Sequence, residues 1–470
     1  MIITDLKEYQ KKALEAIKQN ITGDVRGYGL FMDMGTGKTL VALSYCDYLF
    51  NKGLIRKCII ICPKSIMYQW KNEIIKHTDI PLSNIGIAHG TYLKRRNVLA
   101  KHKYVIINFD GCKVIPAELV EEAKNNDDLV IIDESSFIKH RSSQRTRLIH
   151  IIGDYAKYKL ILTGAPITTG AENIWSQFRY TNPEIFGKNF YRFMYKWLQV
   201  EIVTGVGTKP FRKIVGVKDE EKFRKAITSG AFIIKKEDCL DLPEQIFYPP
   251  RVFDLNEKHE KMYKKLAKEY LVILEDRTIT YNHKLQVLSK LRQVANGFLY
   301  TDDGTKHIPQ NRRLIELREL IEELDYTRNK IIIVYAFKED KKFIQQVLKK
   351  MNIDKYSCID EHHKTSAELK KFQDLSCPVL IGQIQRLSHG LDCYFATAMI
   401  HYSQYWSTDM RRQVFNRIHR IGQKKKTLYV DLAAKGTIDI GILKIHERNI
   451  KLSEALIQSS AKDLIYGYEN

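Results

Sequence analysis

The sequence lacks the features that mark secreted, membrane-spanning and zinc-binding proteins. Its eight cysteines include no Cys-x-x-Cys pair, so their spacing indicates neither a zinc site nor a disulfide framework. The opening segment MIITDLKEYQ has no signal-peptide core, and no apolar run approaches the length of a membrane span. Internal repeats and low-complexity tracts are also missing. These absences favour a globular, cytoplasmic protein that makes no membrane contact.

Positive charge is in excess. The chain has 76 Lys and Arg against 55 Asp and Glu, which gives a net charge of +21. Such an excess indicates a polyanionic partner, most simply nucleic acid; a solvated basic surface, as in an AT-rich organism, is the alternative. The 470 residues, 44% of them hydrophobic, are enough for two or three domains with cores of their own.

The stretch Leu30–Leu40 contains the pattern Gly35-Thr36-Gly37-Lys38-Thr39. An apolar strand-like segment, Tyr28–Met32, precedes it, and the apolar spacing of Val41–Phe50 predicts a helix. In a phosphate loop the backbone N–H groups cradle the phosphates, a Lys reaches the β- and γ-phosphates, and a Thr hydroxyl meets Mg²⁺. The full pattern has a Gly where Met32 stands. The alternative is a glycine turn between a strand and a helix, with an incidental Lys.

Short β-branched runs alternate with helical stretches, which is typical of βα units around buried parallel sheets. The runs are Cys58–Cys62, Val105–Ile107, Leu129–Ile132, Leu160–Leu162, Ile331–Val334, Val379–Ile381, Met399–Tyr402 and Leu428–Leu432. A break at Lys235–Pro243 and Pro249-Pro250 separates the two series. We predict an α/β fold of two lobes, in which Phe190–Val217 is an insertion on the first. The expected domains are residues 1–235, a linker at 236–250, and residues 251–470 with a helical insertion near 255–300.

Asp133-Glu134 directly follows one of these strands, at the edge where parallel sheets bind ligands. ATP hydrolysis needs one carboxylate to support Mg²⁺ and another to orient and deprotonate the attacking water. A solvated loop is the alternative. Thr163–Thr168 follows the next strand and is either an ordinary turn or a device that couples phosphate state to lobe movement. Tyr9-Gln10, on an expected helix, has the chemistry to hold adenine, although such a Tyr is usually just packed.

Arg417 and Arg420 are three residues apart, so they are predicted to share a helical face. Arginines from a second lobe can neutralise charge on a transferring phosphoryl group. They would reach the phosphate loop only if the second lobe closes over the nucleotide. A surface basic helix is the alternative.

Taken together, these residues resemble the Swi/Snf-type ATPases of helicase superfamily two, over nearly the whole chain. Several stretches carry the resemblance. They are Leu6–Gln10 (the glutamine motif), Asp33–Thr39 (the phosphate loop), Cys62–Ser65 with Gln69-Trp70 (a motif near the DNA track), Asp133–Ser136 followed by Phe137–Lys139 (the Walker B box), Leu162–Pro166 (the third motif), Leu242-Pro243 ahead of Tyr263 (the interlobe segment), Leu291–Gln293 and Gln413–Gln423 (the last motif).

The resemblance implies two RecA-like lobes and DNA-stimulated hydrolysis of ATP with Mg²⁺. By motif, the implied catalytic residues are Lys38, Asp133, Glu134, Arg417 and Arg420. The implied metal ligands are Thr39 and Asp133. The implied nucleotide-binding residues are Tyr9, Gln10, Met34, Gly35, Thr36, Gly37, Lys38, Thr39, Gly390, Asp392 and Gln413.

The chain departs from the family pattern at three places. Ser135-Ser136 stand where the box usually ends in His, Ile167-Thr168-Thr169 replace the usual Gln-Asn, and Asp392 stands where Asn is typical. These changes are compatible with hydrolysis but affect the expected coupling between hydrolysis and DNA contact.

The leading hypothesis is an ATP-dependent motor that moves along double-stranded DNA by tracking its backbone. The alternatives are a strand-separating or branch-migrating helicase, a non-hydrolysing DNA-binding clamp, and, more weakly, a motor on RNA. No nuclease, RING or chromatin-reading module can be recognised, so the chain looks like a minimal phage or bacterial motor. We expect a monomer in the cytoplasm of a bacterium or a phage-infected cell. Replication, recombination or transcription proteins of phage or host are its candidate partners.

Overall fold

The computed structural model describes residues 1–20, 27–125, 127–164, 166–167, 170–203, 211–275, 281–362, 365–388, 392–448 and 461–467. The chain divides into two compact units, Met1–Asp241 and Leu242–Asn470. The division lies inside the segment 236–250. None of the helices in the described part of the chain combines the length and the apolar character that crossing a bilayer requires.

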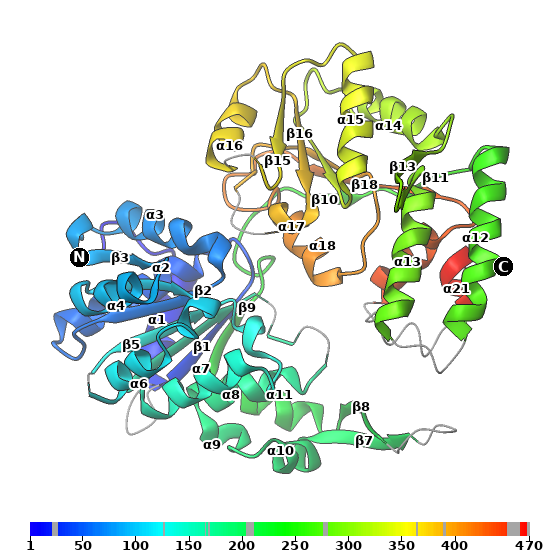
Figure 1. Cartoon of the computed structure of the whole chain (residues 1–470). Helices are drawn as coiled ribbons and strands as arrows, with labels where there is room; N and C mark the ends of the chain where they lie inside the picture. The colour runs from blue at the N-terminus through cyan, green and yellow to red at the C-terminus, as the bar shows by residue number, and fades with distance from the viewer. Residues whose placement is uncertain are drawn as a thin grey trace. The chain divides into compact units, whose positions relative to one another are not determined.

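The first unit contains a parallel sheet of seven strands among its described residues (Figure 1). In spatial order these are β3 (Ile85–Ala88), β4 (Tyr104–Asn108), β2 (Cys58–Cys62), β5 (Leu129–Asp133), β6 (Tyr158–Thr163), β1 (Gly27–Met32) and β9 (Ala231–Ile234). The four strands predicted in this unit, and the strand before the phosphate loop, are all present. β3 and β9 were not predicted: Gly86 interrupts the apolar run of β3, and β9 is a partly buried edge strand.

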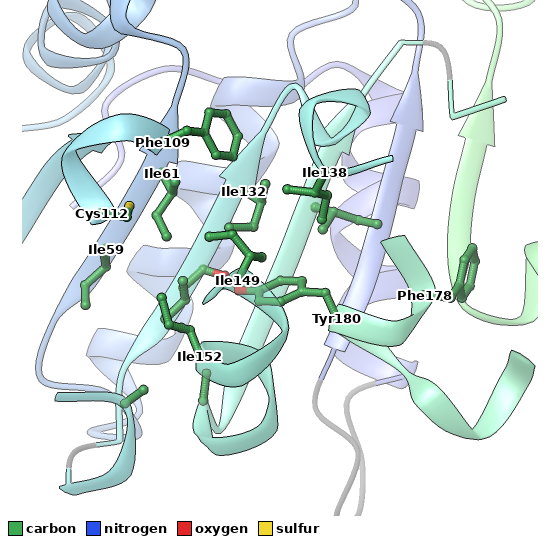
Figure 2. Close-up of a cluster of buried hydrophobic side chains, with 14 of the residues drawn as sticks. Ile59, Ile61, Phe109, Cys112, Ile132, Ile138, Ile149, Ile152, Phe178 and Tyr180 are labelled. Carbon is green, nitrogen blue, oxygen red and sulfur yellow. Dashed lines mark hydrogen bonds between the residues drawn. The ribbon is translucent and has the colours of Figure 1, made fainter. Parts of the chain in front are cut away.

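Both faces of this sheet are covered, which is why its strands read as continuous apolar runs. One face packs against α1 (Glu8–Asn20), α2 (Lys38–Asn51) and α3 (Met67–His77). The other packs against α4 (Tyr92–Lys101), α5 (Phe109–Cys112), α6 (Pro116–Asn125), α7 (Gln144–Tyr155) and α8 (Asn173–Thr181). Figure 2 shows this second core, where Ile59 and Ile61 of β2 lie among Phe109, Ile132 and Ile149.

The predicted insertion Phe190–Val217 forms a helix and an antiparallel hairpin. Its elements are α10 (Phe190–Trp197), β7 (Leu198–Val203) and β8 (Phe211–Val217), flanked by α9 (Pro183–Phe186) and α11 (Glu220–Ser229). Phe193 and Met194 of α10 are buried, and Phe186, Phe193, Trp197 and Phe223 form an aromatic cluster. The hairpin is thereby attached to the core of the first unit.

The second unit has a parallel sheet in the order β10-β18-β17-β14-β16-β15, with β11 also paired to β18. The strands are β10 (Gln245–Phe247), β11 (Arg251–Phe253), β14 (Ile331–Tyr335), β15 (Tyr356–Ile359), β16 (Val379–Gln383), β17 (Ala398–His401) and β18 (Thr427–Ala434). The four predicted strands are present. β10 lies inside the segment expected to be a linker, where it pairs with β18 through Gln245–Phe247.

Helices cover this sheet on both faces. One core includes α14 (Arg312–Glu323) and α15 (Lys338–Lys350); the other includes α16 (Thr365–Gln373), α17 (Ile384–Leu387) and α18 (Thr408–Phe415). A separate apolar cluster joins α12 (Glu257–Glu275), α13 (Tyr281–Ala295), α19 (Ile438–Arg448) and α21 (Ala461–Tyr466). The helical insertion predicted near 255–300 corresponds to α12 and α13, but its end is a hairpin of β12 (Phe298–Thr301) and β13 (Gly304–His307).

Candidate functional site

The phosphate loop connects the end of β1 to the start of α2. Gly35 and Gly37 have φ of 83° and 81°, a left-handed conformation that glycine adopts without steric cost. A Cβ atom at Gly37 would also lie 2.3 Å from Gln10 Nε2. Backbone geometry therefore favours glycine at both positions, and close packing also excludes a side chain at 37. Helix α2 begins at Lys38, three residues before the predicted start at Val41.

Helix α1 supports this loop. The Tyr9 hydroxyl and the Gln10 amide both donate to the Thr36 carbonyl, at 2.9 and 3.0 Å. The Lys7 N–H donates to Gln10 Oε1 at 2.9 Å, which fixes the orientation of the amide. Two residues expected to bind adenine thus make direct contacts with the loop backbone.

The Lys38 ammonium lies back over the start of the loop. It donates to the carbonyl oxygens of Met32 at 2.6 Å and Asp33 at 3.1 Å. The Thr36 hydroxyl donates to the same Asp33 carbonyl at 2.7 Å. These contacts shape the loop around a cation next to a helix N-terminus, the arrangement that binds phosphate groups.

Asp133 and Glu134 lie where β5 ends, as predicted. The Glu134 N–H donates to Asp133 Oδ1 at 2.8 Å. Glu134 has φ 53° and ψ 58°, a left-handed conformation that is uncommon outside Gly, Asn and Asp and recurs at functional sites. The backbone therefore leaves the extended conformation of β5 at Glu134.

A tryptophan contacts this carboxylate pair. The Trp70 indole N–H donates to Asp133 Oδ2 at 2.7 Å. Burial and the charge of Glu134 raise the pKa of Asp133, whereas the Trp70 hydrogen bond and the Lys38 charge lower it. The motif containing Trp70 was recognised in the sequence, but this contact was missed. No local sequence signal indicates this contact, because it depends on the pairing of β2, which precedes α3, with β5.

The donor set suits Mg²⁺ bound together with a nucleotide. Thr39 offers a hydroxyl and Asp133 a carboxylate, and NTPase sites hold Mg²⁺ with few protein oxygens plus substrate phosphates. Among the described residues there is no group of three or more His, Cys, Asp or Glu that could hold a metal by themselves. Each Asp133 oxygen accepts one hydrogen bond and has further lone-pair capacity.

Ser135, the third residue of the box Asp133–Ser136, is buried and connects to the third motif. Its hydroxyl donates to Gln177 Oε1 at 2.6 Å, and Gln177 Nε2 donates to the Pro166 carbonyl at 2.7 Å. Gln177 was not identified from the sequence, since it lies on α8, 42 positions after Ser135. In the segment Thr163–Thr168, Ala165 and Thr168 lie outside the described residues.

In the second unit the predicted helical face of Arg417 and Arg420 is wrong. Helix α18 ends at Phe415, and the Arg417 carbonyl accepts the N–H of Cys393 at 3.0 Å, a contact outside the helix. The Arg417 guanidinium contacts the Ser388 carbonyl, and Arg420 forms an ion pair with Asp392. Arg420 of the last motif thus contacts Asp392, one of the predicted nucleotide-binding residues. Gln413 lies on α18, and Gly390 lies outside the described residues.

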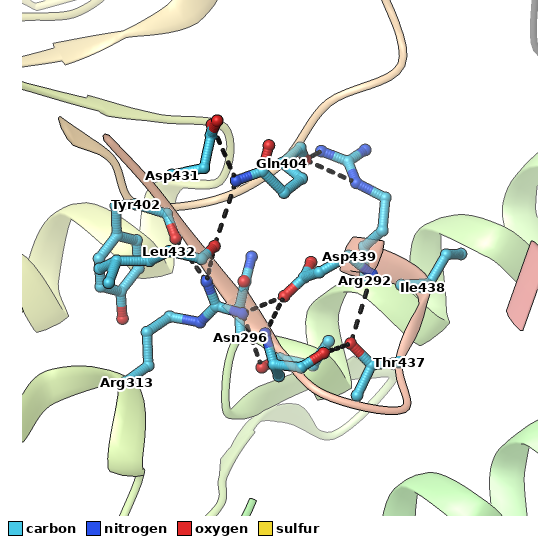
Figure 3. A network of polar contacts seen from close by, with 12 residues as sticks. Arg292, Asn296, Arg313, Tyr402, Gln404, Asp431, Leu432, Thr437, Ile438 and Asp439 are labelled. Atoms are coloured by element: carbon cyan, nitrogen blue, oxygen red, sulfur yellow. Dashed lines mark hydrogen bonds and ion pairs between the residues drawn. The ribbon is translucent and has the colours of Figure 1, made fainter. Parts of the chain in front are cut away.

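Buried polar contacts connect the helices of the second unit to its sheet (Figure 3). Arg411 of α18 pairs with Asp431 of β18, which also accepts from His401 and Gln404. Arg292, from the leucine–arginine–glutamine motif, donates to the Gln404 carbonyl, and Arg313 pairs with Asp439. Helices α13 and α18 therefore both contact Gln404, which follows β17: Arg292 donates to its carbonyl and Arg411 to its side-chain oxygen.

Comparison with known proteins agrees with these motifs. A model of the SNF2-related domain matches residues 9–298, and one of the helicase conserved C-terminal domain matches residues 313–422. The chain belongs to the SNF2-related family. The predicted recognition is confirmed, and so is the predicted α/β fold class, with helices flanking a parallel sheet in each of the two units.

Curated relatives of this SNF2-related chain are longer proteins. An uncharacterized ATP-dependent helicase of Mycoplasma genitalium is 26% identical over 96% of this chain and 42% of its own length. The ISWI chromatin-remodeling complex ATPase ISW2 of Saccharomyces cerevisiae is 22% identical over 96% of this chain and 41% of its own. The chain therefore spans about two fifths of the length of these relatives.

A solved structure covers the whole chain. The Sulfolobus solfataricus SWI2/SNF2 ATPase core in complex with dsDNA is 21% identical, with coverage of 100% of this chain and 98% of that one. Its TM-score is 0.44, too low for a residue-by-residue superposition.

Proposed function

We propose that this chain hydrolyses ATP and uses the energy to move along double-stranded DNA. The observation that carries the proposal is the meeting of two motifs in one unit. The phosphate loop at Gly35–Thr39 and the carboxylates at Asp133 and Glu134 follow two strands of one parallel sheet. The Lys38 charge lowers the pKa of Asp133. Membership of the SNF2-related family supports the same conclusion.

Each residue has a role in this proposal. The loop backbone and Lys38 bind the phosphates, while Thr39 and Asp133 hold Mg²⁺. When bound, Mg²⁺ neutralises charge on the phosphate oxygens. Glu134 orients the attacking water and takes its proton. Arg417 and Arg420 neutralise charge that develops on the transferring phosphoryl group.

Double-stranded DNA is the proposed track. The net charge of +21 favours a polyanion, and several relatives are named helicases, two of them DNA helicases. Strand separation, a non-hydrolysing clamp and an RNA track are the competing functions. We also propose that the protein is a cytoplasmic monomer and that it acts with replication, recombination or transcription proteins.

The test is the steady-state ATPase rate of the whole chain with no nucleic acid, single-stranded DNA, double-stranded DNA and RNA. The proposal expects the greatest stimulation by duplex DNA, with little dependence on its sequence. Affinity for the duplex should fall steeply with salt, by a log–log slope of about −0.9 for each phosphate contacted. Absence of ATP turnover under all four conditions, or greatest stimulation by RNA, would contradict the proposal.

A further inference from the structure

The Trp70 indole is buried at one side of the Asp133 carboxylate. Its side chain belongs to the core between the sheet and α1–α3, and the residue is only 2% exposed. Its N–H donates to Asp133 Oδ2, while the Glu134 N–H donates to Oδ1. Each oxygen of this carboxylate therefore accepts a hydrogen bond from a fixed donor. One donor is on the adjacent residue, and the other is 63 residues away in the sequence.

We propose that Trp70 is a positioning residue for the Mg²⁺ site, acting through Asp133. The hydrogen bond holds the carboxylate in one orientation, so that its remaining lone pairs are directed the same way whenever Mg²⁺ arrives with a nucleotide. Partners of metal-ligating carboxylates commonly act in this manner, and their removal typically costs about 10–100-fold in metal affinity or activity. This inference rests on the proposed function, because it assigns a role within the same ATP and Mg²⁺ site.

Packing alone is the competing explanation for Trp70. A buried indole N–H usually finds an acceptor, and a backbone carbonyl would satisfy it equally well. Trp175 of α8 illustrates that case, because it is 6% exposed and donates to the Gly187 carbonyl at 3.0 Å. The two tryptophans share a unit, similar burial and one hydrogen bond each, so Trp175→Phe is a matched control for Trp70→Phe.

The first experiment measures binding of a fluorescent ADP to the whole chain, once with Mg²⁺ and once with EDTA. Trp70→Phe should reduce the Mg²⁺-dependent gain in affinity about tenfold or more, with affinity in EDTA within about twofold of wild type. Trp175→Phe should leave the Mg²⁺-dependent gain unchanged. Higher Mg²⁺ should also restore ATP turnover in Trp70→Phe. Equal losses with and without Mg²⁺, or an unchanged gain, would overturn the positioning role.

A double variant tests whether Trp70 acts through Asp133. In an Asp133→Ala background, Trp70→Phe should have no further effect on the Mg²⁺-dependent gain, since the carboxylate is already gone. A further loss of similar size would show that Trp70 acts by another route and would overturn the inference. If wild type shows no Mg²⁺-dependent gain at all, the proposed function itself fails, a result distinct from either outcome in the variants.

A second measurement leaves Trp70 unchanged. The chain has four tryptophans, so labelling with 5-fluorotryptophan should give four ¹⁹F signals. Asp133→Ala should shift one of them strongly, and addition of Mg²⁺ with ADP to the wild type should shift that same signal. If Asp133→Ala shifts none of the four signals, the contact between Trp70 and Asp133 is absent and the proposal fails.

Discussion

At the residue scale, Glu134 combines a proposed catalytic role with a costly backbone conformation. Its φ of 53° places it in the left-handed region, which costs a non-glycine residue on the order of 1 kcal/mol or more. We expect Glu134→Gln to bind ATP normally but to lose about 10²–10⁴-fold in turnover, because only the base is removed. Glu134→Gly should be equally inactive but no less heat-stable than Glu134→Gln. ATPase assays and thermal unfolding measure both effects, and wild-type turnover in Glu134→Gln would contradict the assigned role.

A second residue, Asp128, predicts how stability depends on pH. It is 1% exposed, and burial together with the charge of Glu122 raises its pKa to about 7. The folded chain therefore binds more protons at this group than the unfolded chain does, so the free energy of unfolding falls as pH rises from about 4 to about 7. Asp128→Asn removes this decrease and should unfold at higher urea than wild type at pH 8, by a free energy on the order of 2–4 kcal/mol. An equal pH slope in both proteins would contradict this.

At the scale of elements, the contact between α1 and the phosphate loop makes a prediction about base recognition. Gln10 donates to the Thr36 carbonyl and its Oε1 accepts from the Lys7 N–H, so in this arrangement it supports the loop. If that is its main role, Gln10→Ala should weaken binding of ATP and GTP by the same factor. If it instead reads adenine, the variant should lose ATP affinity selectively. Equilibrium binding of the two nucleotides separates these outcomes, with Gln19→Ala, at the other end of α1, as the control.

Another element, α18, depends on the buried pair of Arg411 and Asp431. Burial opposes ionisation of Asp431, but the Arg411 charge and the His401 hydrogen bond hold its pKa well below its usual range. Asp431→Asn leaves Arg411 buried without its partner charge and should lower the free energy of unfolding by about 3–5 kcal/mol at neutral pH. Glu244→Gln, which breaks the exposed pair with Lys426, should change it little. Similar midpoints for both variants in urea unfolding would show that the buried pair does not anchor α18.

At the scale of the whole molecule, the ATP hydrolysis that we propose requires residues from both units. Arg420→Ala should leave nucleotide binding largely intact, while turnover on saturating duplex DNA falls by about 10³–10⁵-fold. Arg417→Ala should act in the same direction. Arg412→Ala, an exposed arginine of α18, is the control and should have little effect. Near-wild-type rates in both Arg417→Ala and Arg420→Ala would contradict the role given to these arginines.

What the sequence determined by itself were the features set by local chemistry. Gly35 and Gly37 allow a left-handed turn between a strand and a helix. Asp133 comes at the end of a run of apolar residues that forms a strand. These patterns involve residues within a few positions of one another, so they predicted the phosphate loop, the strand end and both parallel sheets. The family motifs added the assignment of nucleotide and metal roles.

Only the tertiary structure decided which side chains meet. Trp70 reaches Asp133 because β2 and β5 are neighbours in the sheet, and Gln10 reaches Thr36 because α1 packs beside α2. The end of α18 at Phe415 was equally hidden, since spacing alone favoured a helix through Arg420. The Arg417 carbonyl instead accepts the N–H of Cys393. Such contacts depend on strand order and on long-range hydrogen bonds, which local sequence does not encode.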